Sequence, residues 1–139
     1  MDQMARDFQD QAHFIFVYVR EAHPDDNPEY PEHKSHEQKV QHARAMRDKH
    51  GTPRKILVDG LDGDVHRDYG GIPNMSWIID HTGRVAYKAG WTIASEIREA
   101  MEDVVRVREL KRVASEKGTI FRTYYKETIS ALRSGRATQ

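Results

Sequence analysis

The stretch that decides the fold runs from His13 to Val19 and reads HFIFVYV. Each residue after His13 is aromatic or β-branched, and these residue types are enriched in strands. The stretch lacks the alternation of polar and apolar residues that a half-exposed strand shows. It therefore predicts a strand that is buried on both faces, as in a parallel sheet covered by helices.

The flanking sequence extends this strand into an alternating series of elements. The elements that we predict are the end of a helix in residues 1–11, strands at 13–19, 55–59, 74–80 and 84–89, a helix from Ser35 to Gly51, a helical turn within 65–69, and a long helix capped by Thr92 or Ser95. An alternating order of this kind predicts a three-layer α/β/α sandwich with a mixed sheet.

Local signals mark where several of these elements begin and end. Ser35 and Gln38 fit the capping box, in which a hydroxyl and an amide each satisfy a free backbone N–H. Gly51 suits the left-handed conformation in which many helices end. The short turn 81–83 makes the strands on either side of it an antiparallel hairpin. Residues 21–34 contain three prolines and predict an irregular loop.

The composition is that of one domain of ordinary size. Among 139 residues, 22 Lys and Arg balance 22 Asp and Glu, so the net charge is zero. No global field therefore draws the chain toward nucleic acid or a membrane. No run approaches the roughly 20 apolar residues that cross a bilayer, and residues 1–11 are too polar for a secretory signal. We expect a cytoplasmic protein with neither a membrane nor a nucleic acid as partner.

Residues 109–139 differ in character from residues 1–108, and we predict a division between them. Basic residues outnumber acidic ones in the tail, and apolar and aromatic residues recur at helical spacing from Ile120 to Leu132. This pattern predicts a basic amphipathic helix docked on the domain or on a partner, with a homodimer as one possibility. A nucleic-acid-binding tail is disfavoured, because basic residues on a helix mostly solvate it.

The chain contains no cysteine. This count excludes disulfides, thiolate metal sites and thiol catalysis by these 139 residues.

Two segments resemble a known family. Tyr69 to Pro73 (YGGIP) runs into the strand predicted at 74–80, and in the thioredoxin fold this position carries a cis-proline that faces the redox nucleophile. Phe16 to Pro24 (FVYVREAHP) closely resembles the F-V-Y-I-x-E-A-H-P segment of iodothyronine deiodinases and their bacterial relatives. The resemblance covers roughly residues 1–105. It implies a thioredoxin-like fold and a redoxin-like domain related to selenoproteins.

Family members reductively remove iodine with a selenocysteine or cysteine at the start of a helix. By this resemblance we expect the nucleophile just before Met1, so that the chain is N-terminally truncated and lacks the first strand or strands of the fold. The missing central strand should lie between strands 13–19 and 74–80. Unless those two strands pair directly, exposed edges should make the chain poorly stable or self-associating.

The sequence offers no catalytic residue, and the auxiliary site that we predict consists of Glu21, His23 and Pro73. Glu21 and His23 follow strand 13–19, at the edge where open α/β sheets bind ligands. A histidine near a carboxylate can move protons or hold a phenolic hydroxyl near neutral pH. The resemblance implies a small aromatic or halogenated substrate, or a thiol reductant, as the partner.

Four histidines lie close together in the sequence: His23, His33, His36 and His42. His33 and His36 would chelate a metal if both were helical, but a cap at Ser35 places His33 outside the helix. We therefore interpret these residues as solvated loop histidines and expect no metal and no cofactor. The DGLDGD stretch at 59–64 does not meet the calcium-loop pattern.

Three functions stay open at this point. The first is a deiodinase-like or thiol/selenol oxidoreductase domain, inactive as written because the nucleophile is missing. The second is a cysteine-free, non-catalytic interaction or dimerisation module of thioredoxin fold. The third is a ligand-binding domain that uses the cleft beside Glu21 and His23.

Overall fold

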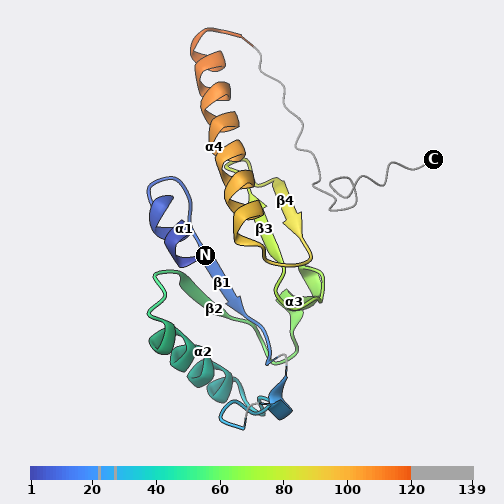
Figure 1. The fold of residues 1–139 in the computed structure, drawn as a ribbon. Helices are drawn as coiled ribbons and strands as arrows, with labels where there is room; N and C mark the ends of the chain where they lie inside the picture. The colour runs from blue at the N-terminus through green and yellow to red at the C-terminus, as the bar shows by residue number, and fades with distance from the viewer. Residues whose placement is uncertain (22, 27, 120–139) are drawn as a thin grey trace, which may run out of the picture. The chain divides into compact units, whose positions relative to one another are not determined.

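The computed structural model describes residues 1–21, 23–26 and 28–119, which form two compact units (Figure 1). The first unit is Met1–Pro73, and the second begins at Asn74. The tail predicted at 109–139 lies mostly outside the described residues, although helix α4 (Ala94–Glu116) continues without a break past residue 108. The division at 108/109 stays a prediction.

The first unit is built around a parallel pair of strands. Its elements are α1 (Asp2–Asp7), β1 (Ile15–Tyr18), the 3₁₀ turn η1 (Pro24–Asp26), α2 (His36–His50), β2 (Lys55–Val58) and α3 (Asp64–Asp68). β1 and β2 pair in parallel, with Phe16 opposite Ile56, and α2 connects them and packs against β2. This β–α–β arrangement follows from geometry, because parallel strands need a long crossover that is usually a helix.

The two faces of the β1–β2 pair differ in exposure. Tyr18 is buried, whereas Ile15 on the opposite face is 52% exposed and Leu57 is 43% exposed. The prediction that this stretch is buried on both faces is therefore wrong at Ile15. The physical reason is that successive side chains point to opposite sides of a strand, and the side that carries Ile15 and Leu57 is only partly covered.

Helix α2 confirms most of the predicted capping. Ser35 Oγ accepts a hydrogen bond of 3.1 Å from the Gln38 backbone N–H, and Gly51 ends the helix at φ 55°. The Gln38 side chain departs from the capping box, because its Oε1 accepts from the backbone N–H of Lys34 at 2.8 Å rather than from that of Ser35. The cap therefore fixes Lys34 and, with it, the end of the loop that contains His33.

The second unit contains the predicted hairpin and a long helix. β3 (Ser76–Ile79) and β4 (Val85–Ala89) pair antiparallel, with a bulge between Ile78 and Ile79, and α4 follows. Neither Thr92 nor Ser95 caps α4, whose N-cap is Ile93. That prediction is wrong because Thr92 Oγ1 donates to the carbonyl of Asn74 at 2.9 Å and lies 2.5 Å from Ser76 Oγ.

The buried carboxylate of Asp80 holds the turn of the hairpin. Its Oδ1 accepts from Thr82 N–H at 2.8 Å, from Thr82 Oγ1 at 2.6 Å and from Arg84 N–H at 3.1 Å. Gly83 adopts φ 81°, which favours glycine, and its N–H donates to the Asp80 carbonyl.

These elements make the chain a mixed α/β protein of thioredoxin-like type, as predicted, with parallel and antiparallel pairing and a C-terminal helix. Within the described residues the strands form two separate two-stranded sheets, β1–β2 and β3–β4.

The expected cis-proline is not found, because the Ile72–Pro73 bond is trans. The segment turns instead through positive φ angles at Gly70, Gly71 and Asn74, so the reversal of the chain needs no cis bond. Pro73 lies exposed in this turn.

Over residues 1–21, 23–26 and 28–119, no helix combines the length and the apolarity required to cross a bilayer.

Replacing Asp80 with Ala should lower the free energy of unfolding of the second unit by about 1–3 kcal/mol, because three part-buried hydrogen bonds at the turn lose their charged acceptor. Asp80→Asn keeps a carbonyl oxygen as an acceptor and should therefore lower the free energy of unfolding by less than Asp80→Ala does. Both tryptophans, Trp77 and Trp91, lie in this unit, so urea unfolding followed by tryptophan fluorescence measures the effect. Equal stability of the alanine variant and the parent would contradict this role.

The half-open face of β1–β2 should make the chain self-associate, because the exposed apolar side chains of Ile15 and Leu57 lie on one face of this sheet. Size-exclusion chromatography with light scattering should show a concentration-dependent rise in mass. The double variant Ile15→Thr, Leu57→Thr should reduce that rise while its far-UV circular dichroism stays unchanged. A parent chain that is monomeric at every concentration would refute the expectation.

Candidate functional site

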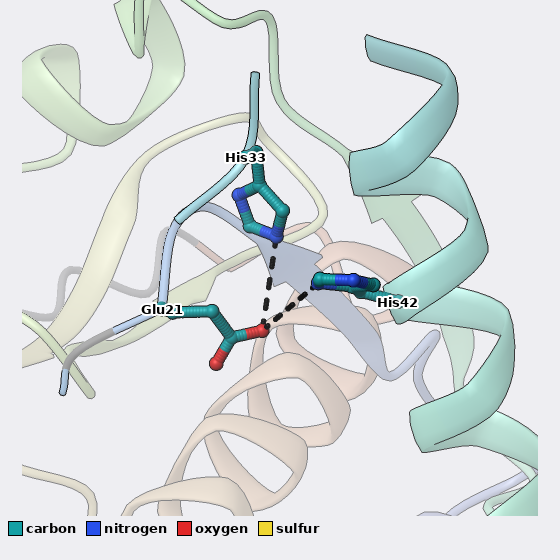
Figure 2. Close-up of side chains that lie close together, drawn as sticks. All are labelled: Glu21, His33 and His42. Atoms are coloured by element: carbon teal, nitrogen blue, oxygen red, sulfur yellow. Dashed lines mark ion pairs between the residues drawn. The ribbon is translucent and has the colours of Figure 1, made fainter. Parts of the chain in front are cut away.

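A carboxylate and two imidazoles meet in the first unit (Figure 2). Glu21 Oε1 lies 3.7 Å from His33 Nε2 and 3.9 Å from His42 Nδ1. The Tyr18 hydroxyl donates a hydrogen bond to the same Glu21 oxygen and lies 3.5 Å from His33 Nε2. Four polar side chains from three segments of the chain therefore share one small volume, which we call the Glu21 cluster: Tyr18, Glu21, His33 and His42.

The chain places each member by a local cause. Tyr18 is the last residue of β1, and Glu21 follows three residues later at the carboxyl end of that strand. His33 precedes the Ser35 cap of α2, and His42 lies within α2 beside the buried Ala43. Because α2 packs against β2, which pairs with β1, the crossover brings His42 back to the end of β1.

Burial sets the electrostatics of the cluster. The side chains of His33, His42 and Glu21 are 6%, 12% and 25% exposed. Burial raises the pKa of Glu21 above 4.5, and the positive charge of His42 partly opposes this rise. Burial also lowers the pKa of His33 below 6.5, and the charges of His42 and Lys39 lower it further. His33 is therefore neutral at neutral pH.

Aromatic rings enclose the two histidines. The His33 and His42 rings lie 4.9 Å apart, the Tyr18 ring meets His33 edge-on at 5.6 Å, and the Tyr30 ring meets His42 edge-on at 5.3 Å. His42 Nδ1 is fully buried, yet it has no hydrogen-bond partner among the described residues. An unsatisfied buried nitrogen costs free energy, so this atom marks a place where a partner is expected.

A buried lysine lies beside the cluster. Lys39 is 2% exposed, and its Nζ donates to the Gly60 carbonyl at 2.7 Å. Burial lowers the pKa of Lys39, while Asp59 and Asp62 act in the opposite direction. Asp59 in turn accepts from the backbone N–H groups of Val65 and His66 and so fixes the start of α3.

A cleft of about 510 Å³ opens at the carboxyl ends of the two parallel strands. Glu21 and His33 line it together with Lys39, and residues 61–63 and His66 line it from the segment that follows β2. Its position fits the rule that ligands of open α/β sheets bind beyond the carboxyl ends of the strands.

The structure brings together only part of the predicted auxiliary site. Glu21 lies in the cluster, whereas His23 is 80% exposed and has its Nδ1 3.8 Å from Asp26 Oδ2. Pro73 lies in the exposed turn before β3 and does not line the cleft. The roles predicted for His23 and Pro73 stay predictions.

Sequence reasoning missed Tyr18, His33, His42 and Lys39 as site residues. The interpretation of His33 and His42 as solvated is wrong, because both rings are packed against other rings and the cluster buries them. One signal was available: Tyr18 precedes Glu21 by three residues and ends the strand on its most buried side. The meeting of His33 with His42 has no signature in their spacing, because the loop between β1 and α2 determines it.

Comparison with known proteins places the chain in a family. The family model described as "Iodothyronine deiodinase" matches residues 1–105. The chain belongs to the iodothyronine deiodinase family. The match contains every residue of the Glu21 cluster.

The curated relative "Type II iodothyronine deiodinase" from Fundulus heteroclitus is 29% identical over 100 residues. The alignment covers 63% of this chain and 37% of that protein, so the chain corresponds to a little over one third of the relative's length. No solved structure matches the chain.

The low pKa of His33 predicts how the first unit responds to acid. Unfolded His33 binds a proton near pH 6.5 and folded His33 binds it only at lower pH, so this residue destabilises the fold as the pH falls below 6.5. Glu21 acts in the opposite sense, because its raised pKa favours the folded state as the pH falls toward 4.5. Substituting His33 therefore isolates its contribution to the pH dependence of stability.

His33→Gln should therefore lose less stability than the parent when the pH falls from about 7 to about 5.5. Amide hydrogen exchange of β1 and β2 at both pH values measures the difference within the first unit. The matched control is His36→Ala, because His36 is an exposed histidine; this variant should behave like the parent. If His33→Gln and the parent lose equal stability, then His33 does not titrate as proposed.

Proposed function

We propose that the Glu21 cluster is the substrate-binding and proton-handling side of a deiodinase-like reductive site. The observation that carries this proposal is the hydrogen-bonded contact of Tyr18, Glu21 and His33 beside a cleft at the carboxyl end of β1. The substrate class is a phenol that bears iodine on its ring, as in the thyroxine-like compounds that the family name implies.

The chemistry requires a group that moves protons. Reductive deiodination breaks a C–I bond and forms a C–H bond: the aryl iodide takes up two electrons and one proton and releases iodide. Two thiols supply the electrons when they are oxidised to a disulfide, and they release two protons. A neutral imidazole next to a carboxyl group of raised pKa can accept or deliver such a proton near neutral pH.

The nucleophile is the part of this reaction that the 139 residues do not supply, because they contain no cysteine. In this proposal a selenol or thiol from outside these residues attacks the iodine, and the Glu21 cluster holds the phenolic hydroxyl and moves protons. Sequencing the DNA upstream of codon 1 tests the origin of that group. An upstream segment in the same reading frame that encodes a strand followed by a cysteine or TGA codon would support an upstream nucleophile. The absence of such a segment would contradict an upstream nucleophile.

Thyroxine binding tests the proposal without requiring turnover. We expect the chain to bind thyroxine, and Glu21→Gln to weaken the binding about tenfold, the loss of one hydrogen bond to a charged group. Isothermal titration calorimetry measures both affinities.

The matched control is Asp26→Asn, which removes an exposed carboxylate from the same loop and should leave the affinity unchanged. The proposal fails if the folded parent chain does not bind thyroxine, or if Glu21→Gln binds as tightly as the parent.

A second candidate function is a non-catalytic interaction or dimerisation module. The observation that favours it is the exposed apolar pair Ile15 and Leu57 on the β1–β2 sheet. If the chain is such a module, we expect it not to bind thyroxine and to self-associate through Ile15 and Leu57.

A further inference from the structure

We propose that Glu21, His33 and His42 form a binding site for a late first-row divalent metal ion of the Zn²⁺ class. Glu21 Oε1, His33 Nε2 and His42 Nδ1 all lie within 4.8 Å of one another (Figure 2). This inference goes beyond the proposed function, because it concerns a metal ion and not an iodinated phenol.

The spacing is close to that of a coordinated set. Ligand atoms at 2.0–2.1 Å from a tetrahedral ion lie about 3.3 Å apart. The carboxylate oxygen is 3.7 Å from one imidazole nitrogen and 3.9 Å from the other. Each of these two distances must shorten by about half an ångström, and the two imidazole nitrogens, which lie within 4.8 Å of each other, must also approach.

The donor set also fits such an ion. Two imidazoles and one carboxylate are typical ligands of zinc and its neighbours, and three protein ligands leave a fourth position for water. Magnesium and calcium prefer sets made of oxygen atoms and should bind poorly here.

His42 supplies an independent observation. Its Nδ1 atom is buried and lacks a hydrogen-bond partner within the described part of the chain, although it points toward the Glu21 carboxylate (Figure 2). A metal ion between the three atoms would satisfy this nitrogen. Tyr18 would then be an outer partner, since its hydroxyl already donates to Glu21 Oε1 and would orient the ligating carboxylate.

Charge and access are compatible with a cation. Glu21 and His33 line the cleft, which gives an ion a route from solvent. Three basic side chains also line the cleft, Arg20, Lys39 and Arg67, and the carboxylates of Glu32 and Asp62 line it with opposite sign.

A zinc titration tests the proposal on the 139-residue chain. Calorimetry at neutral pH should show one Zn²⁺ bound per chain, and Co²⁺ should give the visible absorption of a tetrahedral site. His42→Ala should weaken Zn²⁺ binding by at least about 100-fold, more than the 10–100-fold typical of an outer partner. His36→Ala removes an exposed histidine of the same helix and should bind Zn²⁺ as the parent does.

Glu21→Gln is a second test variant, for use if His42→Ala does not fold by far-UV circular dichroism without metal. It should also bind Zn²⁺ at least about 100-fold more weakly than the parent. Unchanged binding in the folded variants, or loss in His36→Ala instead, would overturn the proposal, as would a folded parent chain that binds no Zn²⁺. These outcomes are independent of thyroxine binding, which is measured without metal.

Discussion

The partial burial of one carboxylate at the end of β1, that of Glu21, is the constraint on which the site depends. Glu21 follows Tyr18, the last residue of β1, by three residues, and its partly buried carboxylate needs partners, because a charged or polar group removed from water is costly without them. The Tyr18 hydroxyl meets part of this need, and the two imidazoles surround the same oxygen. The loop 21–34 and the crossover helix α2 bring these groups to one place.

The same burial gives the site its chemical character. It moves the pKa of Glu21 up and that of His33 down, so a carboxyl group and a neutral imidazole face each other. That arrangement suits proton transfer, and it equally suits a metal ion, which also needs a neutral imidazole. The two proposed uses draw on Glu21 and His33 alike, so a bound metal ion would compete with the handling of protons. His42 separates them, because the metal site requires its Nδ1, whereas the phenol proposal rests on Tyr18, Glu21 and His33.

Local sequence signals predicted the elements well but not the cluster. The β-branched run of β1, the Ser35 cap and the Gly51 end of α2 depend on neighbours in the chain, and each is found. Thr92 failed as a cap because its hydroxyl is taken by Asn74, eighteen residues away. Pro73 failed as a cis-proline because Gly70, Gly71 and Asn74 already turn the chain. The contact between His33 and His42 could not be predicted from the sequence either, because the course of the proline-rich loop 21–34 determines it.

The titration of the individual histidines tests this account most directly. Two-dimensional NMR of the imidazole rings follows each histidine through pH in the parent chain, in His42→Ala and in His36→Ala. The account predicts that His33 titrates below 6.5 in the parent, moves up toward 6.5 in His42→Ala because a neighbouring positive charge is lost, and stays low in His36→Ala. A His33 that titrates at 6.5 in all three chains would show that the buried cluster does not form.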